Sequence, residues 1–148
     1  MANFTFNEGA TAAASAGVDW VGTDWDCCLY EDMVVPDQTM TWTEVQASII
    51  ATVPYANKAI TANGACSADA IEFIDVATTQ PDGRIPGFII KRNSDNLLLV
   101  HFDQGFDNLG PRPVTGNIID ILNVRADNVS FTFTLNPGLN NEAAWFRL

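Results

Sequence analysis

The chain has 148 residues, 47% of them hydrophobic, and a formal net charge of −11 at pH 7. This length and apolar content argue against a disordered chain and allow a core to form without disulfides or a metal ion. We therefore expect one domain over residues 1–148. The negative charge argues against binding to nucleic-acid phosphates or to an anionic membrane surface.

The charge is unevenly distributed along the chain. Residues 1–57 hold eight acidic and no basic side chains, whereas residues 58–148 hold ten acidic side chains and all seven basic ones. No apolar run is long enough to span a bilayer. The small-residue stretch 9–17 follows no basic or apolar lead-in, which argues against a secretion signal.

The first predicted element is a short helix over residues 8–16, which are good helix formers and are followed by Gly17 as a stop. Alternation then predicts a half-buried strand over residues 24–30. Its dry face would consist of Trp25, Cys27 and Leu29. Its wet face would consist of Asp24, Asp26, Cys28 and Tyr30.

A brief helix is predicted over residues 41–49, because Thr43 and Gln46 have capping-box spacing. Residues 63–64, Asn-Gly, then favour a hairpin turn, the first of the β signals that dominate the rest of the chain. The strand after this turn would place Ile71 and Phe73 on one face, opposite Glu72 and Ile74.

The next two apolar segments, residues 87–92 and 96–103, flank a polar turn at 93–96 and predict a hairpin near the centre of a sheet. Strict alternation in the second strand would place His101 on the face of Leu97 and Leu99, opposite Leu98, Val100 and Phe102.

Three more strands are predicted over residues 117–124, 129–135 and 143–148, the last of them after a loop at 136–141. For residues 117–124 a single helical turn is the alternative. Such short strands, joined by turns rich in Gly, Pro and Asn, are typical of antiparallel β folds. We predict a mainly β protein, an antiparallel β-sandwich or barrel-like single domain of seven to eight strands with a short N-terminal helix.

The three cysteines form neither an even set nor a Cys-x-x-Cys motif, which favours reduced thiols. A bridge from Cys66 to either Cys27 or Cys28 is the alternative. Adjacent residues of a strand point to opposite faces, so Cys27 and Cys28 are poorly placed to share a metal ion. We therefore expect Cys27 in the core and Cys28 on a polar face.

A calcium site has to be weighed against a solvated acidic face. The candidate ligands are Asp24, Asp26, Glu31, Asp32, Asp103 and Asp107. Neither acidic segment has the alternating Asp/Asn pattern and closing Glu of a calcium loop. We expect no metal site and no cofactor.

His101 is the only histidine, and a hydrolase would need it paired with a nucleophile and a carboxylate. Ser67, Ser94 and Asp103 are available, but no nucleophile motif surrounds them. This favours a structural histidine and no catalytic residue. Paired carboxylates for glycoside cleavage are an alternative that only a distance between them can test. Another alternative is a sugar-binding aromatic platform, for which the candidates are Trp20, Trp42 and Tyr55.

A series of short motifs follows the same order through the chain. They are "GVDW" and "GTDWDCCLY" in the first third, "KAITANG" and "SADAIEF" in the middle, and "HFD", "PVTG" and "WFRL" toward the C-terminus. In this order the chain resembles a widespread family of small virion structural proteins of tailed bacteriophages. Two departures are residues 117–127, which look like an insertion, and the double cysteine, which replaces aliphatic residues.

The resemblance implies a non-enzymatic virion protein, a capsid decoration (cement) protein that stabilises the head by bridging major capsid subunits. It implies synthesis in the bacterial cytoplasm and a final place on the outer capsid surface. The implied partners are the major capsid protein and further copies of the chain, as a trimer, with no nucleic acid and no membrane. The alternative is a head-fibre or tail-associated adhesion module that binds host surface glycans.

Overall fold

The computed structural model describes residues 4–60, 66–69, 71–79, 85–102 and 129–133. It confirms a mainly β, antiparallel fold with a short N-terminal helix, and nine strands lie within the described residues. The helices are α1 (Asn7–Ser15), α2 (Trp42–Val45) and a 3-10 turn, η1 (Gln46–Ser48). The strands are β1 (Phe4–Thr5), β2 (Trp25–Tyr30), β3 (Ile49–Pro54), β4 (Ala59–Ile60), β5 (Cys66–Ser67), β6 (Ile71–Val76), β7 (Gly87–Arg92), β8 (Leu98–Phe102) and β9 (Val129–Phe133).

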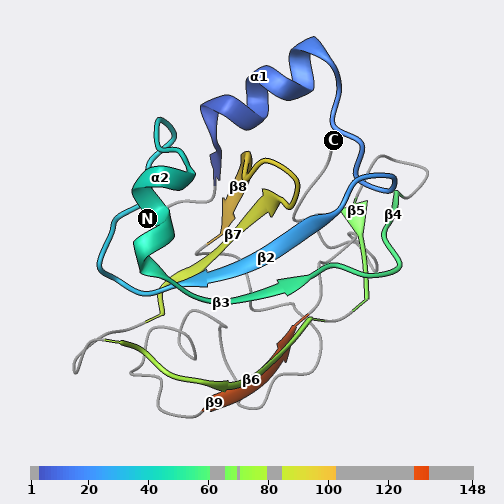
Figure 1. The fold of residues 1–148 in the computed structure, drawn as a ribbon. Coiled ribbons are helices and arrows are strands. Elements are labelled where there is room, and N and C mark those ends of the chain that lie inside the picture. The colour runs from blue at the N-terminus through green and yellow to red at the C-terminus, as the bar shows by residue number, and fades with distance from the viewer. Residues whose placement is uncertain (1–3, 61–65, 70, 80–84, 103–128, 134–148) are drawn as a thin grey trace, which may run out of the picture.

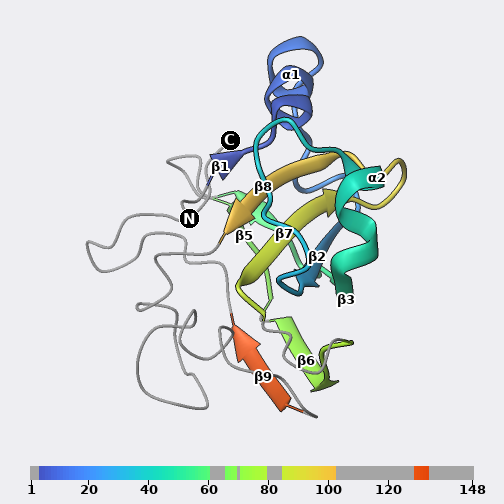
Figure 2. The same cartoon turned by 90° about the vertical axis from the view of Figure 1, so that its left-hand side faces the viewer.

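Five strands form one antiparallel sheet in the order β1-β8-β7-β2-β3 (Figure 1). Within the described residues the sheet is open, with β1 and β3 at its two edges, so it does not close into a barrel. β6 and β9 pair in a second, two-stranded sheet that lies below the first in Figure 2. β4 and β5 pair on either side of the predicted Asn-Gly turn, which itself lies outside the described residues.

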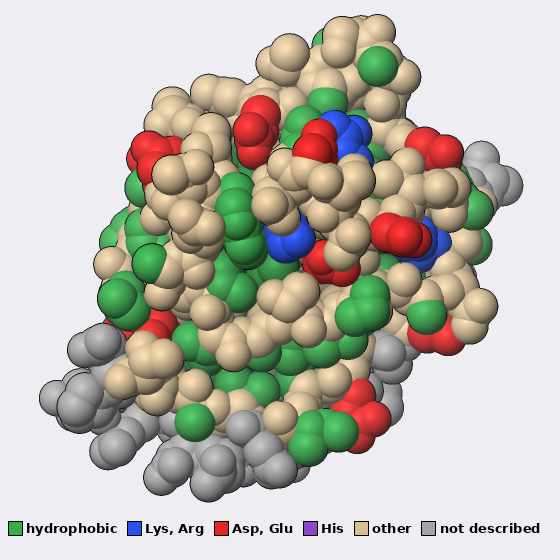
Figure 3. Space-filling view, viewed as in Figure 1, with side chains coloured by type: hydrophobic (Ala, Val, Ile, Leu, Met, Phe, Trp, Pro, Cys, Tyr) green, Lys and Arg blue, Asp and Glu red, His purple; other side chains and the backbone are tan. Residues whose placement is uncertain are grey.

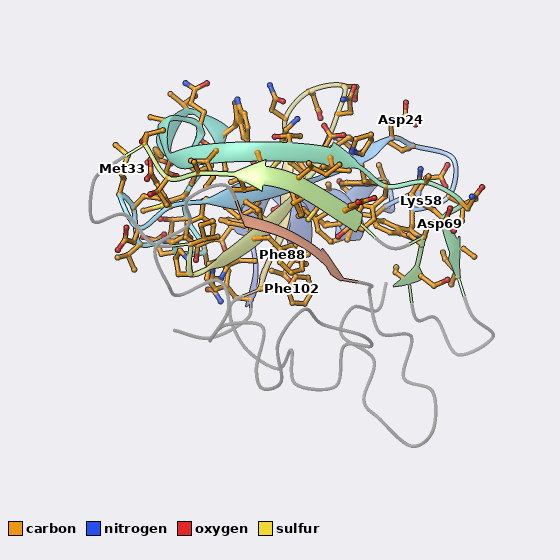
Figure 4. All side chains as sticks on the ribbon, turned by 90° about the horizontal axis from the view of Figure 1, so that it is seen from below. Asp24, Met33, Lys58, Asp69, Phe88 and Phe102 are labelled. Carbon is orange, nitrogen blue, oxygen red and sulfur yellow. The ribbon has the colours of Figure 1, made fainter. Side chains whose placement is uncertain are left out.

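The first face of the five-stranded sheet packs against the strand β6. The buried cluster on this face draws on β2, β7 and β8 through Trp25, Leu29, Phe88 and Phe102, and on β6 through Phe73. The rings of Phe88 and Phe102 are tilted by 30° against each other with 5.1 Å between their centroids, and Figure 4 shows them together beneath the sheet. The predicted faces of β6 are confirmed. Ile71 and Phe73 are buried, whereas Glu72 and Ile74 are exposed.

The second face of the sheet is also covered, which corrects the prediction of a wet face on β2. All six residues of β2 are buried, including Asp26, Cys28 and Tyr30. The cover consists of Phe6, α2 and the segment between β2 and α2. Its apolar residues pack on Tyr30, Ile89 and Leu98 of the sheet. Since β2 lies inside the sheet and both faces are covered, alternation of residue type no longer separates inside from outside.

Gly9 and Gly17 determine where α1 lies and where it ends. A Cβ on Gly9 would come within 2.8 Å of the Leu98 carbonyl oxygen and 2.9 Å of Leu99 Cα, so only glycine lets the helix approach β8 this closely. Gly17 has φ +77, a left-handed conformation that follows the helix and stops it, as predicted.

The helix predicted over residues 41–49 is present, but its capping residues differ from the expected pair. Thr41 is the N-cap, its backbone N–H donates to Glu44 Oε2 at 2.7 Å, and the reciprocal bond completes a capping box. The predicted pair Thr43 and Gln46 has the same spacing two residues later. The helix starts at the first of the two available boxes.

The hairpin of β7 and β8 is confirmed, and both strands lie inside the sheet. Its register shifts between Ile90 and Lys91, because β8 carries one extra residue there. After this bulge Leu99 packs with Val100 in the first core, whereas Leu98 lies in the second. The prediction that Leu99 and His101 share a face was therefore wrong, since a bulge reverses the alternation on one side of it.

Several sequence predictions fall on residues outside the described ranges: the strands at 117–124 and 143–148 and the loop at 136–141. The strand predicted over 129–135 is present as β9. Among the described helices, none has the length and apolar character needed to cross a membrane.

We predict that Gly9→Ala destabilises the protein although alanine is the better helix former. The new methyl group would push α1 off β8 backbone atoms that cannot rotate away, which typically costs about 1–3 kcal/mol. Urea unfolding should show this loss. The control is Ala13→Gly on the exposed side of α1, which should cost only the propensity difference of about 1 kcal/mol. A Gly9→Ala protein more stable than the wild type would show that α1 is not held at this distance.

Candidate functional site

A buried ion pair lies on the face of β2 that was expected to be wet. Asp26 and Lys91 are cross-strand neighbours, and Lys91 Nζ donates to Asp26 Oδ2 at 3.1 Å. The amide of Asn93 donates to the same oxygen at 3.0 Å, and Asn96 Oδ1 accepts from Lys91 Nζ at 2.9 Å. The two charges are thus neutralised and hydrogen-bonded inside the protein, 4% and 6% exposed.

Trp42 closes this polar cluster from outside. Its half-buried ring lies 4.9 Å from Lys91 Nζ, within the range of a cation–π contact. Trp42, one of the three residues predicted as a possible sugar platform, therefore packs against the buried Lys91 side chain. The other two do not reach the surface: Trp20 is fully buried and Tyr55 is 5% exposed. The structure does not bring these three aromatic residues together on an exposed face.

His101 is fully buried and lies on the second face of the sheet, between β1 and β2 side chains. Its Nε2 shares a hydrogen bond of 2.6 Å with the Tyr30 hydroxyl, and its ring lies 4.7 Å from that of Phe4. Asp103, the carboxylate proposed for a catalytic arrangement, lies outside the described residues. His101 thus occupies an interior position, in contact with two aromatic rings.

The three cysteines are free and buried. Burial raises the pKa of Cys28 from its ordinary value of 9.0 to about 11, and that of Cys66 to about 12. The pKa of Cys27 is also raised well above 9.0 by burial. Such thiols stay protonated at neutral pH and are poor nucleophiles and poor metal ligands. Cys28 was expected on a polar face, and the correction follows from the cover over the second face of the sheet.

The acidic residues around β2 do not form one cluster. Asp24 and Asp32 are exposed, whereas Asp26 is paired with Lys91 and Glu31 is fully buried. The Glu31 carboxylate accepts hydrogen bonds from the backbone N–H and the hydroxyl of Thr79. No group of three or more potential metal ligands occurs within the described residues, and Asp103 and Asp107 lie outside them.

The segment between β2 and α2, residues 31–41, carries the most unusual surface. Met33 and Val35 are 53% and 68% exposed, while Val34 between them packs on the second core and Pro36 is buried. Figure 4 shows Met33 at one end of the molecule, far from Asp24 at the other. The segment therefore faces inward with one set of side chains and presents large apolar groups to solvent with the other.

A shallow groove of about 390 Å³ lies against the second half of this segment, from Pro36 to Thr39, and is lined mainly by apolar surface. Its lining consists of Phe4, Pro36, Asp37, Gln38 and Thr39. The hydroxyl and the N–H of Thr39 both donate to Asp37 Oδ1, and these bonds lower the pKa of Asp37 below its usual value. The groove therefore carries an apolar floor and a stable negative charge.

No protein-family model, no curated protein and no solved structure matches this chain. The similarity to phage virion proteins therefore stays a prediction that depends on the order of short motifs.

Sequence reasoning missed the Asp26–Lys91 pair and the apolar 31–41 surface. The sequence contained a signal for the pair. Asp26 lies among the mostly apolar residues 25–30, and Lys91 ends an apolar run in residues 87–92. The surface had a weaker signal: in "DMVVPD" three apolar residues and a proline are enclosed by two aspartates. Which of these residues point outward depends on how the segment crosses the sheet.

We predict that Asp26→Asn destabilises the protein by about 3–5 kcal/mol, because it leaves the buried Lys91 ammonium without its counter-charge. Urea unfolding measures the loss. The matched control is Asp24→Asn, two residues away and exposed, which should change stability by less than about 0.5 kcal/mol. Equal effects of the two substitutions would mean that Asp26 is solvated.

We also predict that stability falls in alkaline solution through Cys28. Its folded pKa is about 11 and its ordinary value is 9.0, so above pH 9 the unfolded thiol ionises while the folded one stays neutral. The stabilisation is complete below pH 9 and is lost as the pH rises to about 11, at up to about 1.4 kcal/mol per pH unit. Urea unfolding at pH 8, 9 and 10 gives the free energy of unfolding at each pH. This free energy should fall less steeply with rising pH in Cys28→Ala than in the wild type. Identical slopes would contradict the assignment.

Proposed function

We propose that this chain is a non-enzymatic structural protein of a tailed-bacteriophage virion, a decoration protein that stabilises the head by bridging major capsid subunits. The proposal assigns the chain no catalytic, cofactor-binding or metal-binding residue. It places the protein on the outer capsid surface after synthesis in the bacterial cytoplasm.

The observation that carries the proposal is the surface of residues 31–41. Large apolar side chains are exposed there between carboxylates, on a segment held against a covered sheet. Surfaces of this kind are typical of contacts between proteins. The order of the sequence motifs supports a phage particle as the assembly. The exposed apolar residues of this segment support attachment to another protein.

The internal roles of the reactive side chains also support a binding function. His101 contacts Tyr30 and Phe4, Lys91 neutralises Asp26, and the thiols are protonated in the interior. These groups hold the sheet and its covers together. A protein that reinforces a shell needs such a stiff body, because a flexible one would lose binding free energy to ordering.

The charge of the chain fits the outside of a particle. A net charge of −11 would repel packaged DNA but is compatible with a surface that faces solvent. Cementing relies on many weak contacts repeated by the symmetry of the shell, each burying about 1,000 Å² or more in total. We expect the protein to bind as a closed oligomer, a trimer at local three-fold positions.

We predict that phage heads lacking this protein rupture at lower temperature than complete heads. The measurement is thermal release of DNA, followed by dye fluorescence, with re-addition of purified protein as the control that restores stability. The copy number in intact particles should be about one per major capsid subunit.

Heads of unchanged stability would count against a cementing role. A copy number of a few to about a dozen per particle, as expected for tail or neck proteins with their lower symmetry, would also contradict it.

A further inference from the structure

We infer that Lys91 and Asn96 react with each other inside the folded protein and become joined by an amide bond between their side chains. Lys91 Nζ is the nucleophile, the Asn96 side-chain amide is the acceptor, and Asp26 carries the proton that has to move. The reaction occurs once in each chain and releases ammonia. It is a modification of the protein by itself, and it does not depend on the proposed function.

The reacting groups of Lys91 and Asn96 are already in contact. Nζ donates to Asn96 Oδ1 at 2.9 Å. Because a carbonyl bond is about 1.23 Å long, the side-chain carbon Cγ of Asn96 lies at most about 4.1 Å from Nζ. Attack on this carbon needs a separation of about 3–3.5 Å. A small movement of the flexible lysine chain therefore completes the approach.

The backbone holds both residues in this arrangement before the reaction. Lys91 is the cross-strand neighbour of Asp26 in the pairing of β7 with β2. In the turn that follows, the Asn96 N–H donates to the Arg92 carbonyl oxygen at 2.9 Å, and the Arg92 N–H donates to the Leu97 carbonyl oxygen at 2.9 Å. Asn96 has φ 60, a left-handed conformation that asparagine tolerates. Groups positioned in this way react much faster than the same groups free in solution.

Asp26 can carry the proton because its Oδ2 lies 3.1 Å from Lys91 Nζ. The lysine ammonium first gives one proton to the Asp26 carboxylate, which leaves a neutral amine with a free electron pair. This pair forms the bond from Nζ to Cγ of Asn96. A second proton of Nζ is then transferred through Asp26 to Asn96 Nδ2.

The bond between Cγ and Nδ2 of Asn96 then breaks with its electron pair on nitrogen, and ammonia leaves. The products are a neutral amide, a protonated Asp26 and one molecule of ammonia. No oxidant or other reactant is needed, unlike in the formation of a disulfide.

The burial of the ion pair favours the reaction. Asp26 and Lys91 are 4% and 6% exposed, and the Trp42 ring covers Nζ at 4.9 Å. A buried ion pair has a desolvation cost, which disappears when both charges are lost. The cover also limits the access of water, which would otherwise compete as a nucleophile or hydrolyse the product.

This environment distinguishes Lys91 from an ordinary surface cation. On the face shown in Figure 3, basic side chains, in blue, occupy small areas close to acidic ones, in red. Arg92 and Asp95 are such a pair, with side chains 25% and 52% exposed. Lys91 differs in that it is buried and that its ammonium group contacts a side-chain amide as well as a carboxylate.

Asn96 is the acceptor, although Asn93 of the same turn also contacts the ion pair. Asn93 turns its Nδ2 toward Asp26 Oδ2, at 3.0 Å, whereas Asn96 presents Oδ1 to Lys91 Nζ. Asn93 is therefore a positioning residue, which orients the carboxylate. The amide bond would close a ring across the turn between β7 and β8 and prevent that turn from opening.

The test is the intact mass of the full-length protein, measured by mass spectrometry under denaturing conditions after prolonged incubation of the folded protein. We expect the wild type to lack the mass of one ammonia molecule relative to its sequence. Asn96→Gly, Lys91→Gln and Asp26→Asn should each keep the full mass of their sequences. Glycine is chosen because it adopts the left-handed backbone and leaves the Lys91–Asp26 pair in place.

Two matched controls should still lose ammonia. Asn93→Ala removes the other asparagine side chain in contact with the pair. Asn57→Gly replaces a second asparagine with a left-handed backbone, φ 51, at an exposed position. Circular dichroism shows which variants fold. If Asp26→Asn does not fold, Asn96→Gly and Lys91→Gln still decide the outcome.

Digestion with trypsin locates the bond, because a succinimide at another asparagine would also release ammonia. Trypsin cleaves after Arg92, which lies between the two reacting residues in the sequence. With the bond present, the peptide that ends at Arg92 and the peptide that begins at Asn93 stay joined after this cleavage. Without it they separate.

A wild type with the full mass of its sequence would overturn the inference. So would a folded Asn96→Gly or Lys91→Gln protein that still lacks one ammonia, or peptides that separate after cleavage at Arg92. Loss of ammonia that persists in folded Asp26→Asn would show that Asp26 is not the proton carrier. None of these results bears on the stability of phage heads, which tests the proposed function separately.

Discussion

The contact between Lys91 and Asp26 decides how the second face of the central sheet is built. An isolated charge in this interior would be strongly unfavourable, so the two neighbouring strands must bring these residues opposite each other, in the one register that pairs them. Asn93 and Asn96 complete their hydrogen bonds, and Trp42 covers them from α2. Because this cluster needs a cover, the burial of β2 on both faces depends on the segment that leads into α2.

The same segment links the interior to the proposed function. Its inward side chains close the second core, and its outward side chains, Met33 and Val35, are the large apolar groups available for a partner. A displacement of the segment would remove part of the apolar cover from the cluster that contains Tyr30. The exposed apolar side chains therefore belong to a segment whose position is determined by the core.

Predictions of which side chains face the core were correct where one face of the element is exposed to solvent. They were wrong where both faces are covered. The alternation of Ile71 and Phe73 with exposed neighbours on β6 was predicted correctly, as were the end of α1 at Gly17 and the β7–β8 hairpin. On β2 the polar side chain of Asp26 was taken as a sign that this face is exposed to solvent, but the face is buried. On β8 one extra residue at the bulge reversed the faces, and no local signal of composition marks such an insertion.

The sequence by itself determined the mainly β class, the short helix and its glycine stop, and the acidic character of the first third, because these depend on local propensity and on counting charges. It also favoured a structural role for the only histidine. Only the tertiary structure decided that Asp26 and Cys28 are buried, that Trp20 and Tyr55 belong to the core, and that Met33 and Val35 remain outside. The physical reason is that burial depends on which distant segment covers a face, and that choice is made by contacts between residues far apart in the chain.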